Sequence, residues 1–358
     1  MPASFAVSGV VVRTIAAAAS ALLLSSQAQA QPPPAATPAL GRWIDVQNAT
    51  LNVRYRFVDT SAGTVTTNQL QHRESVRGRL KFDAPGRYAL NVGAFSGSRF
   101  TSSWNNTGIG LGDPQKTMAV RALYVAAQPV TGVEGQYGGM YIIKGESTEV
   151  TTYDDDGYVT GGRLTVRRPR ELFLDEISIT AGYFTADASE IGIGRRLKYL
   201  DETPNYRHVL VGKKVGARAG VSTDFTSALG AHVWRAAANV KTPELRIVDS
   251  IVFENYKRTN SNPRYGFAVT ADKAVTRRVS INGGYARIDR FYGGLNADRF
   301  NIGNRAFVMT TYALSSRFTA SIFVTTAVGR NAVLPQRTLS NFVFSYNALP
   351  DLRRTGLL

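Results

Sequence analysis

Basic side chains recur at every second position in two segments near the start of the chain. Arg54 and Arg56 flank one aromatic residue, and Arg77 and Arg79 flank a glycine. Because successive side chains of a β-strand point to opposite faces, residues two apart share a face. Strands with this spacing present a basic surface, which attracts anions and repels cations. The candidate residues for this surface, which would line a pore, are Arg54, Arg56, Arg77, Arg79, Lys81, Arg87, Arg163 and Arg167.

The segments that carry these residues have the two-residue period of β-strands. In residues 50–58, apolar side chains alternate with polar ones that include Arg54 and Arg56. Sixteen such segments lie between residues 49 and 347, and short connections alternate with mostly longer ones. This pattern predicts an all-β fold, a transmembrane antiparallel up-and-down β-barrel of about sixteen strands with lipid outside and a polar interior. The basic side chains then face the interior, where they are either available to solutes or paired with an acid such as Glu176.

Two alternatives to this fold follow from the same pattern. Fourteen strands would result if Lys213 and Lys214 lay inside one long strand instead of forming a turn. A soluble β-sandwich also buries one face of each strand, but sandwich strands average about five to six residues, which is shorter than most segments here. No repeat of fixed period is present in the sequence, which argues against a β-solenoid.

The first thirty residues have the features of a secretory signal peptide. Arg13 precedes an apolar stretch at residues 14–24, and Ala28 and Ala30 form a small-residue cleavage pattern. The apolar stretch is too short to span about 30 Å of hydrocarbon as a helix. We expect residues 1–30 to be cleaved, with a retained N-terminal anchor as the alternative.

The rest of the chain is predicted to form one barrel with two extensions. Residues 31–48 form a Pro-rich periplasmic leader, residues 49–347 form the barrel and residues 348–358 form a C-terminal tail. The predicted location is the bacterial outer membrane, reached by export through the inner membrane. Outer-membrane lipid and lipopolysaccharide are the expected surroundings, and small anionic solutes are the expected cargo.

Charge and cysteine content exclude several classes. The formal net charge of +16 would indicate nucleic acid as a partner of a soluble protein, but export from the cytoplasm argues against that partner. The absence of cysteine excludes disulfides and a lipid-anchored cysteine. It also fits a barrel that closes on itself better than a disulfide-stabilised secreted domain.

Aromatic residues cluster near the ends of the predicted strands. Most of them share the apolar parity, which predicts rings at the boundary between water and lipid. Four have the opposite parity and are candidates for stacking on a ligand in the interior: Phe95, Phe184, Phe307 and Phe323.

Two predicted connections have distinctive compositions. Residues 98–116 form the longest loop, which we expect to fold into the barrel as a constriction, with Arg99, Trp104 and Asp113 as its candidate residues. Residues 144–158 are acidic but lack the alternating ligand spacing of a Ca²⁺ loop. We expect a solvated external loop there, bridged to lipopolysaccharide phosphates through divalent ions.

No catalytic, metal or cofactor site can be assembled from the sequence. His72, His208 and His232 are the only histidines, and none has a compact Ser/His/acid spacing. No globular plug precedes the predicted barrel, which argues against the large plugged outer-membrane transporters. We expect a protein without enzymatic activity, with a barrel hydrolase as the weaker alternative.

The Arg-Tyr-Arg-Phe sequence at 54–57 and the Arg-Gly-Arg-Leu-Lys-Phe sequence at 77–82 resemble outer-membrane porin-like channels, including the alginate-export type. The resemblance covers residues 49–347 as a pattern of strands. It implies a passive or facilitated route for small anionic solutes such as uronate oligomers. Such barrels usually end on a terminal aromatic residue, and here residues 348–358 follow the last predicted strand.

The sequence therefore predicts an outer-membrane channel for passive diffusion of small anionic solutes. A non-conducting barrel that acts as a surface receptor or adhesin is the alternative. Residues 245–256 carry apolar side chains of both parities, which would suit contact between copies in a homo-oligomer.

Overall fold

The structure is a computed structural model. It describes residues 43–60, 65–98, 118–152, 158–167, 173–183, 205–228, 230–242, 244–260, 264–288, 300, 303–329 and 337–355. The predicted signal peptide and most of the predicted leader lie outside these residues, as do Arg99, Trp104, Asp113 and Phe184.

Sixteen strands and a C-terminal helix are present among the described residues. The elements are β1 (Ile44–Thr60), β2 (Val65–Lys81), β3 (Tyr88–Ser98), β4 (Met118–Val130), β5 (Val133–Tyr141), β6 (Tyr158–Val166), β7 (Glu176–Tyr183), β8 (Tyr206–Val215), β9 (Ala219–Ala228), β10 (Ala231–Lys241), β11 (Ser250–Arg258), β12 (Arg264–Ala274), β13 (Val279–Ile288), β14 (Gly303–Ala313), β15 (Phe318–Ala327), β16 (Arg337–Asn347) and α4 (Leu349–Arg354).

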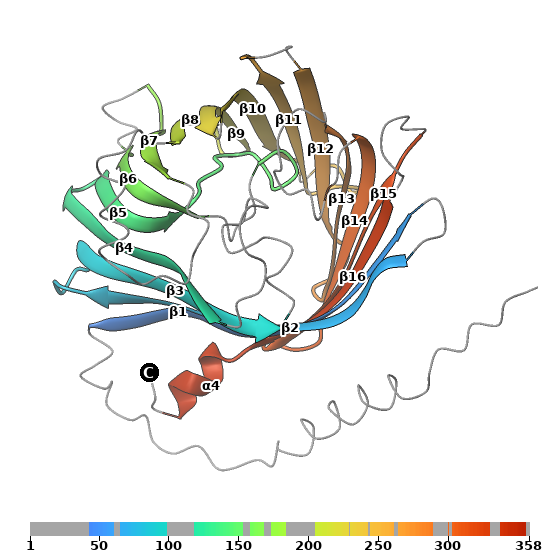
Figure 1. Cartoon of the computed structure of the whole chain (residues 1–358), viewed down its shortest axis with the longest axis horizontal. Coiled ribbons are helices and arrows are strands. Elements are labelled where there is room, and N and C mark those ends of the chain that lie inside the picture. Colours follow the sequence, from blue (N-terminus) through green and yellow to red (C-terminus); the bar gives the residue numbers. More distant parts are fainter. Residues whose placement is uncertain are drawn as a thin grey trace, which may run out of the picture. The chain divides into compact units, whose positions relative to one another are not determined.

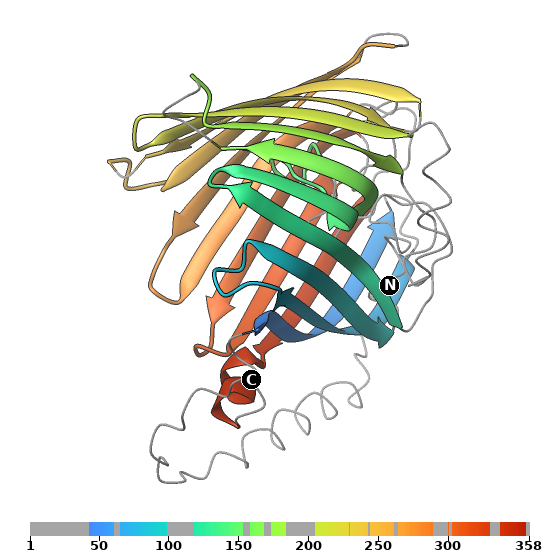
Figure 2. The same cartoon turned by 90° about the vertical axis from the view of Figure 1, so that its left-hand side faces the viewer.

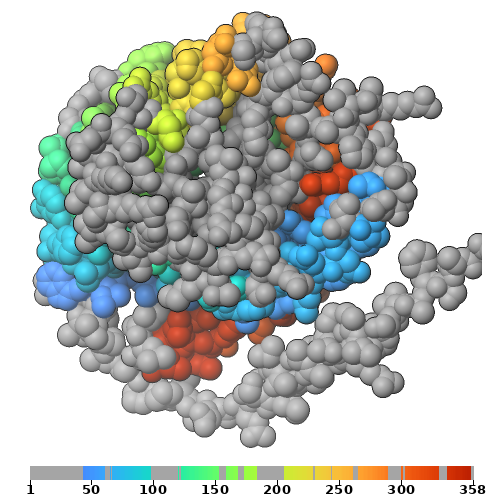
Figure 3. Space-filling model, viewed as in Figure 1, coloured from blue at the N-terminus to red at the C-terminus, as the bar shows by residue number. Residues whose placement is uncertain are grey.

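The strands close into a barrel in chain order. Each strand pairs antiparallel with the strands before and after it, and β16 returns to pair with β1. At this seam Val53 lies opposite Phe344, and Arg56 lies opposite Asn341. Figure 1 looks into the ring of strands, and the space-filling view in Figure 3 shows their atoms following one another around it. The predicted sixteen-stranded antiparallel β-barrel is confirmed.

The two faces of each strand differ in character. On β1, Leu51 and Val53 are 38% and 36% exposed, whereas Arg54 is only 8% exposed. Val58 shares the face of Arg54 and belongs to one buried cluster with Val233 of β10. Because β1 and β10 are far apart around the ring, their side chains can meet only inside the barrel. The basic face of β1 is therefore the inner face, and the apolar face is the outer one.

The outer face carries a band of exposed apolar side chains on all sides of the barrel. Charged side chains on a lipid-facing surface would cost about 2–4 kcal/mol each at mid-membrane, so this distribution is that of a transmembrane barrel. The exposed apolar residues include Leu51, Val53, Leu80, Val125, Leu164, Ile179, Val209, Val221, Phe253, Phe267, Ile281, Val308, Ile322, Phe342 and Phe344.

Residues 213–219 decide between sixteen and fourteen strands. Lys213 and Lys214 lie inside β8, so the turn predicted at these residues is wrong in position. The chain turns one residue after β8 instead, at Gly216, whose φ of +64° is favourable for glycine. Because this turn separates β8 from β9, the sixteen-strand topology stands.

Some strand boundaries differ from the predicted ones. β1 begins at Ile44, so the last residues of the predicted leader belong to the barrel. β11 begins at Ser250, and the preceding residues form a turn in which Ile247 is 84% exposed. The mixed parity at 245–256 therefore reflects a turn followed by a strand.

The C-terminal tail contains α4, which lies beside the short turns at one end of the barrel (Figure 2). Arg317 in the turn between β14 and β15 forms an ion pair with Asp351 at 2.7 Å, and Tyr346 donates a hydrogen bond to the same carboxylate. The amide of Ala348 donates to the carbonyl of Ala49 at 2.9 Å. Within the described residues, no helix has the length and apolar character needed to cross a membrane.

Candidate functional site in the barrel interior

The inner faces of β1 and β2 carry a row of basic side chains. Arg54 Nε donates to Gln71 Oε1 at 2.6 Å, and Arg56 Nε donates to Asn341 Oδ1 at 3.0 Å. These amide acceptors orient the two guanidinium groups without neutralising their charge. Strand register places further basic residues on the same face, and we call the whole set the basic wall: Arg54, Arg56, Arg73, Arg77, Arg79 and Lys81.

Aromatic rings pack against two residues of the basic wall. Arg77 Cζ lies 4.4 Å from the ring centroid of Tyr141, and Arg73 Cζ lies 5.2 Å from that of Phe95. Cation–π contact holds a guanidinium in place while leaving its charge. The Tyr141 ring occupies the space over Gly93, where an added Cβ would lie 2.1 Å from Tyr141 Oη. A glycine at this position therefore makes room for the ring inside the barrel.

The other candidate basic residues are placed differently. Arg163 on β6 is buried and donates to Thr180 Oγ1 and to Gln136 Oε1, both at 3.0 Å. Arg167 follows β6 and forms an ion pair with Glu176 at 3.1 Å, which is the acid that the sequence suggested as a partner. Paired in this way, Arg167 adds little net positive charge to the interior.

Arg87 does not lie on a strand. It precedes β3 in the turn after β2, where its side chain is more than half exposed and its Nε lies 3.5 Å from Asp83 Oδ2. In the same turn, Arg79 donates a hydrogen bond to the carbonyl of Gly86. Arg87 is thus at one mouth of the barrel, outside the inward-facing series in which the sequence analysis placed it.

Three of the four candidate interior aromatic residues are described, and all three face inward. Phe95 lies beside Arg73, as given above. Phe307 and Phe323 both contact Phe300, with ring centroids 5.1 and 5.6 Å from it. Phe307 and Phe323 belong to a packed hydrophobic cluster, so these rings already pack against other side chains of the protein.

A segment between β5 and β6 folds into the barrel. Residues 142–152, which we call the lumen segment, leave the end of β5 and cross to the side of β9–β11 (Figure 1). Ile142 and Val150 are buried in two different interior clusters. Ser147, Thr151 and Thr152 are also buried, so hydroxyl groups as well as apolar ones face the wall.

Hydrogen bonds attach the lumen segment to the opposite wall. The amide of Glu146 donates to Ser222 Oγ at 2.9 Å on β9. Both carboxylate oxygens of Glu254 on β11 accept hydrogen bonds, one from Thr148 Oγ1 and the other from Thr151 Oγ1. Hydrogen bonds to a neutral residue, Ser222, and to an acidic one, Glu254, therefore hold the lumen segment against the wall.

Close packing at Gly145 explains how the segment approaches the wall. Its φ is +59°, and an added Cβ would lie 2.7 Å from Ser222 Oγ and 2.8 Å from Leu210 Cδ1. Glycine satisfies both the backbone conformation and the contact.

The predicted external position of the acidic loop is wrong for residues 144–152. The acidic composition suggested solvent exposure, but Ser147, Val150 and Thr151 of this segment are buried. Val150 packs in a cluster with side chains of remote strands, and Thr151 donates a hydrogen bond to Glu254 of β11. The loop predicted as the constriction, 98–116, lies almost wholly outside the described residues. Among the described residues, 142–152 is a segment that lies inside the barrel and narrows it.

A charged network lies in the wall next to the lumen segment. Arg235 Nη2 donates to Asp224 Oδ1 at 2.7 Å, and Arg235 Nε donates to Asp224 Oδ2 at 3.1 Å. His208 Nε2 lies 3.3 Å from Asp224 Oδ1. All three side chains are buried, and Leu210, which packs on Gly145, is directly opposite Asp224 in the sheet. This network could not be predicted from the sequence, because its members come from three strands and only strand pairing brings them together.

Charges are unevenly distributed around the interior. The basic wall lies on β1 and β2, whereas the acids Glu146, Glu149 and Glu254 lie on the lumen segment and the strand beneath it. A solute passing between them would experience a field across the barrel. Among the described residues, no group of three or more His, Cys, Asp or Glu side chains is arranged to hold a metal ion.

Comparison with known proteins identifies the fold. No family model matches the chain, and no curated protein matches its sequence. The structure of Salmonella typhi OmpF in complex with daunomycin matches with a TM-score of 0.52 at 12% identity, over 86% of this chain and 98% of that chain. Two mutants of the Rh. blastica porin each match with a TM-score of 0.56, at 9% and 10% identity, over 85% of this chain and 99% of theirs.

The class defined by the closed sixteen-stranded barrel is therefore the porin-type β-barrel. Identities of 9–12% establish this fold and leave the solute to be argued from the chain's own interior.

Proposed function

We propose that this protein is an outer-membrane channel for passive diffusion of small, anionic solutes. The observation that carries the proposal is a closed barrel with an apolar outer band and a polar inner face that is narrowed by a folded-in segment. A barrel of this strand number is wide enough to leave an aqueous path. No catalytic step is part of the proposal.

The outer membrane is the proposed location because the barrel is predicted to follow a cleaved signal peptide, residues 1–30. Its outer band would contact lipid, and its loop ends would contact lipopolysaccharide. The end with the longer connections would face outward, and the end with the short turns and α4 would face the periplasm.

Anion preference is proposed from the basic wall. Arg54 and Arg56 donate to amide oxygens, and Arg77 packs on an aromatic ring; none of these contacts cancels the positive charge of the guanidinium. The acids of the lumen segment reduce this preference. On the wall nearby, both carboxylate oxygens of Glu254 already accept hydrogen bonds from Thr148 and Thr151. We therefore expect a modest selectivity for anions over cations.

The reversal potential of the refolded protein in a planar bilayer under a KCl gradient tests both parts of the proposal. We expect discrete current steps and a potential that favours chloride. Arg77→Glu/Arg79→Glu should move the potential toward the cation side. Arg277→Glu/Arg278→Glu, the same charge change in the turn after β12, should move it less.

Each part can fail separately. Steps with cation preference in the wild type would overturn the anion proposal and keep the channel. Absence of steps from protein shown to be folded and inserted would overturn the channel and favour a surface receptor or adhesin.

A homo-oligomer is proposed from polar residues on the outer face. His72 and Glu74 face outward on β2, opposite Val53 and Leu51, with His72 Nδ1 2.9 Å from Glu74 Oε1. Ser96 Oγ donates to Glu74 Oε2 at 2.7 Å. Polar groups facing lipid are costly, so we propose that a second copy of the chain covers this face. Native mass spectrometry should then give a multiple of the protomer mass, and a purely monomeric protein would contradict the proposal.

A further inference from the structure

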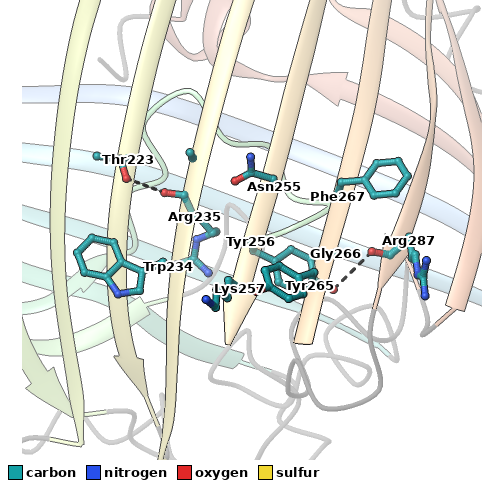
Figure 4. A pocket seen from close by; sticks show the side chains of 11 residues that line it. Thr223, Trp234, Arg235, Asn255, Tyr256, Lys257, Tyr265, Gly266, Phe267 and Arg287 are labelled. Carbon is teal, nitrogen blue, oxygen red and sulfur yellow. Dashed lines mark hydrogen bonds between the residues drawn. The ribbon is translucent and has the colours of Figure 1, made fainter. Parts of the chain in front are cut away.

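The outer face of β9–β13 contains a groove that combines aromatic and cationic side chains (Figure 4). It lies near the ends of these strands that lead to the connections after β9, β11 and β13. Its outward-facing lining residues are Thr223, Trp234, Ala236, Asn255, Lys257, Tyr265, Phe267 and Arg287.

Strand register arranges one side of the groove as a row of two rings and a cation. Trp234 lies opposite Lys257, and Lys257 lies opposite Tyr265. The Nζ atom of Lys257 is 5.3 Å from the ring centroid of Tyr265. The cation is thus placed between two aromatic residues on three neighbouring strands.

The next row along the strands forms the floor and the far side. Ala236, Asn255, Phe267 and Arg287 lie opposite one another in succession on β10 to β13. Ala236 is small, so the surface is depressed there between larger neighbours. Thr223 Oγ1 donates to the carbonyl of Arg235 at 2.9 Å, which keeps the hydroxyl against the wall.

Among the described strand residues, no acid lies on the outer face beside the positive charge of this groove. Among the described residues, Lys257 and Arg287 form no ion pair, and both side chains are exposed. The register places every described acid of β9–β13 on the inner face. Two outward cations on this face would be costly against hydrocarbon but favourable at the level of lipid headgroups.

We propose that this groove binds the phosphorylated headgroup of an outer-leaflet lipid, with a phosphate between Lys257 and Arg287 and the first part of an acyl chain against Trp234 and Phe267. Asn255 can donate a further hydrogen bond to a phosphate or sugar oxygen. Charge-assisted hydrogen bonds to phosphate are the strong ones, and the aromatic rings suit the boundary between headgroup and chain. The inference goes beyond solute passage and takes the outer-membrane location from the proposed function.

Native mass spectrometry of the detergent-solubilised barrel with diphosphorylated lipid A and with a phosphate-free form of the same lipid tests this site. Lys257→Gln/Arg287→Gln should weaken binding of the diphosphorylated lipid about tenfold, since two charge-assisted contacts are lost. Lys213→Gln/Lys273→Gln is the control, because it also removes two outward-facing cations. These lie at the C-terminal ends of β8 and β12, away from the groove. The control should bind like the wild type.

Two results would overturn the proposal. One is equal weakening in the variant and its control, and the other is equal binding of the phosphorylated and phosphate-free lipids by the wild type. Retained heat-modifiable migration of Lys257→Gln/Arg287→Gln on gels shows that it still folds. Its bilayer current should be unchanged, so loss of lipid binding is distinguishable from failure of the channel proposal.

Discussion

The ring of Tyr256 lies across Gly266 on the inner face of the barrel. The two residues are directly opposite each other on β11 and β12. An added Cβ at Gly266 would lie 2.0 Å from Tyr256 Cζ, so the ring occupies the place that a side chain would take. Tyr256 in turn belongs to the cluster that contains Val150 of the lumen segment. A glycine on the wall thus supports the position of a segment in the interior.

Gly266→Ala should destabilise the barrel by about 1–3 kcal/mol, because overpacking forces a buried ring out of its place. Urea unfolding in liposomes measures the change. Gly212→Ala is the control, since it is also a strand glycine and its nearest atom would be 3.8 Å away. Equal stability of the two variants would contradict the packing role of Tyr256.

Asp224→Asn should destabilise the barrel by about 3–5 kcal/mol, because it removes the buried negative charge that Asp224 places beside Arg235. The same unfolding measurement applies. Asp249→Asn is the comparison, because it removes an acid from a more exposed ion pair with Lys273 and should cost less, though still a measurable amount at neutral pH. A small effect at Asp224 would mean that water reaches the network.

Glu254→Ala should loosen the lumen segment, because Thr148 and Thr151 both lose their acceptor. In single-channel recordings we expect larger current fluctuations than in the wild type. Thr148→Ala/Thr151→Ala removes the donors of the same two hydrogen bonds and should also increase the current fluctuations. Asp272→Asn, on the neighbouring strand, should leave the current steady.

The turn before β11 should show a pH dependence at low pH. Hydrogen bonds from Lys273 and from the amide of Ala274 hold the pKa of Asp249 below its usual value. A carboxyl whose pKa is lowered on folding stabilises the folded state above the pKa of the unfolded chain, and this is lost as pH falls through the folded pKa. The difference in urea midpoint between wild type and Asp249→Asn should therefore shrink below about pH 4. A constant difference down to pH 2 would contradict this coupling.

The strands could be predicted because their signal is local. Alternation in segments such as residues 50–58 gives both the strand and the face, and the structure places Arg54 and Leu51 on the expected sides. The positions of turns are harder to predict, as Lys213 and Lys214 show. Charged residues are common in turns, but they are also tolerated at strand ends.

The lumen segment could not be predicted because its partners are remote in sequence. Glu146 bonds to a residue 76 positions later, and Thr148 to one 106 positions later. Locally its acidic side chains indicate solvent, and its small buried ones carry little signal. His208 likewise has no close acid in the sequence and gains Asp224 only through the pairing of β8 with β9.

The seam between β1 and β16 has a consequence for assembly. Arg56 and Asn341, which are hydrogen-bonded there, are 285 residues apart in the chain. Joining such distant segments carries a large loop-closure entropy, and it requires that all fourteen strands between β1 and β16 have already been delivered. Until β16 arrives, β1 presents an unpaired edge that can pair with other chains. The first strand therefore has to be kept from other chains until β16 pairs with it, and closure of the ring reports that β16 has arrived.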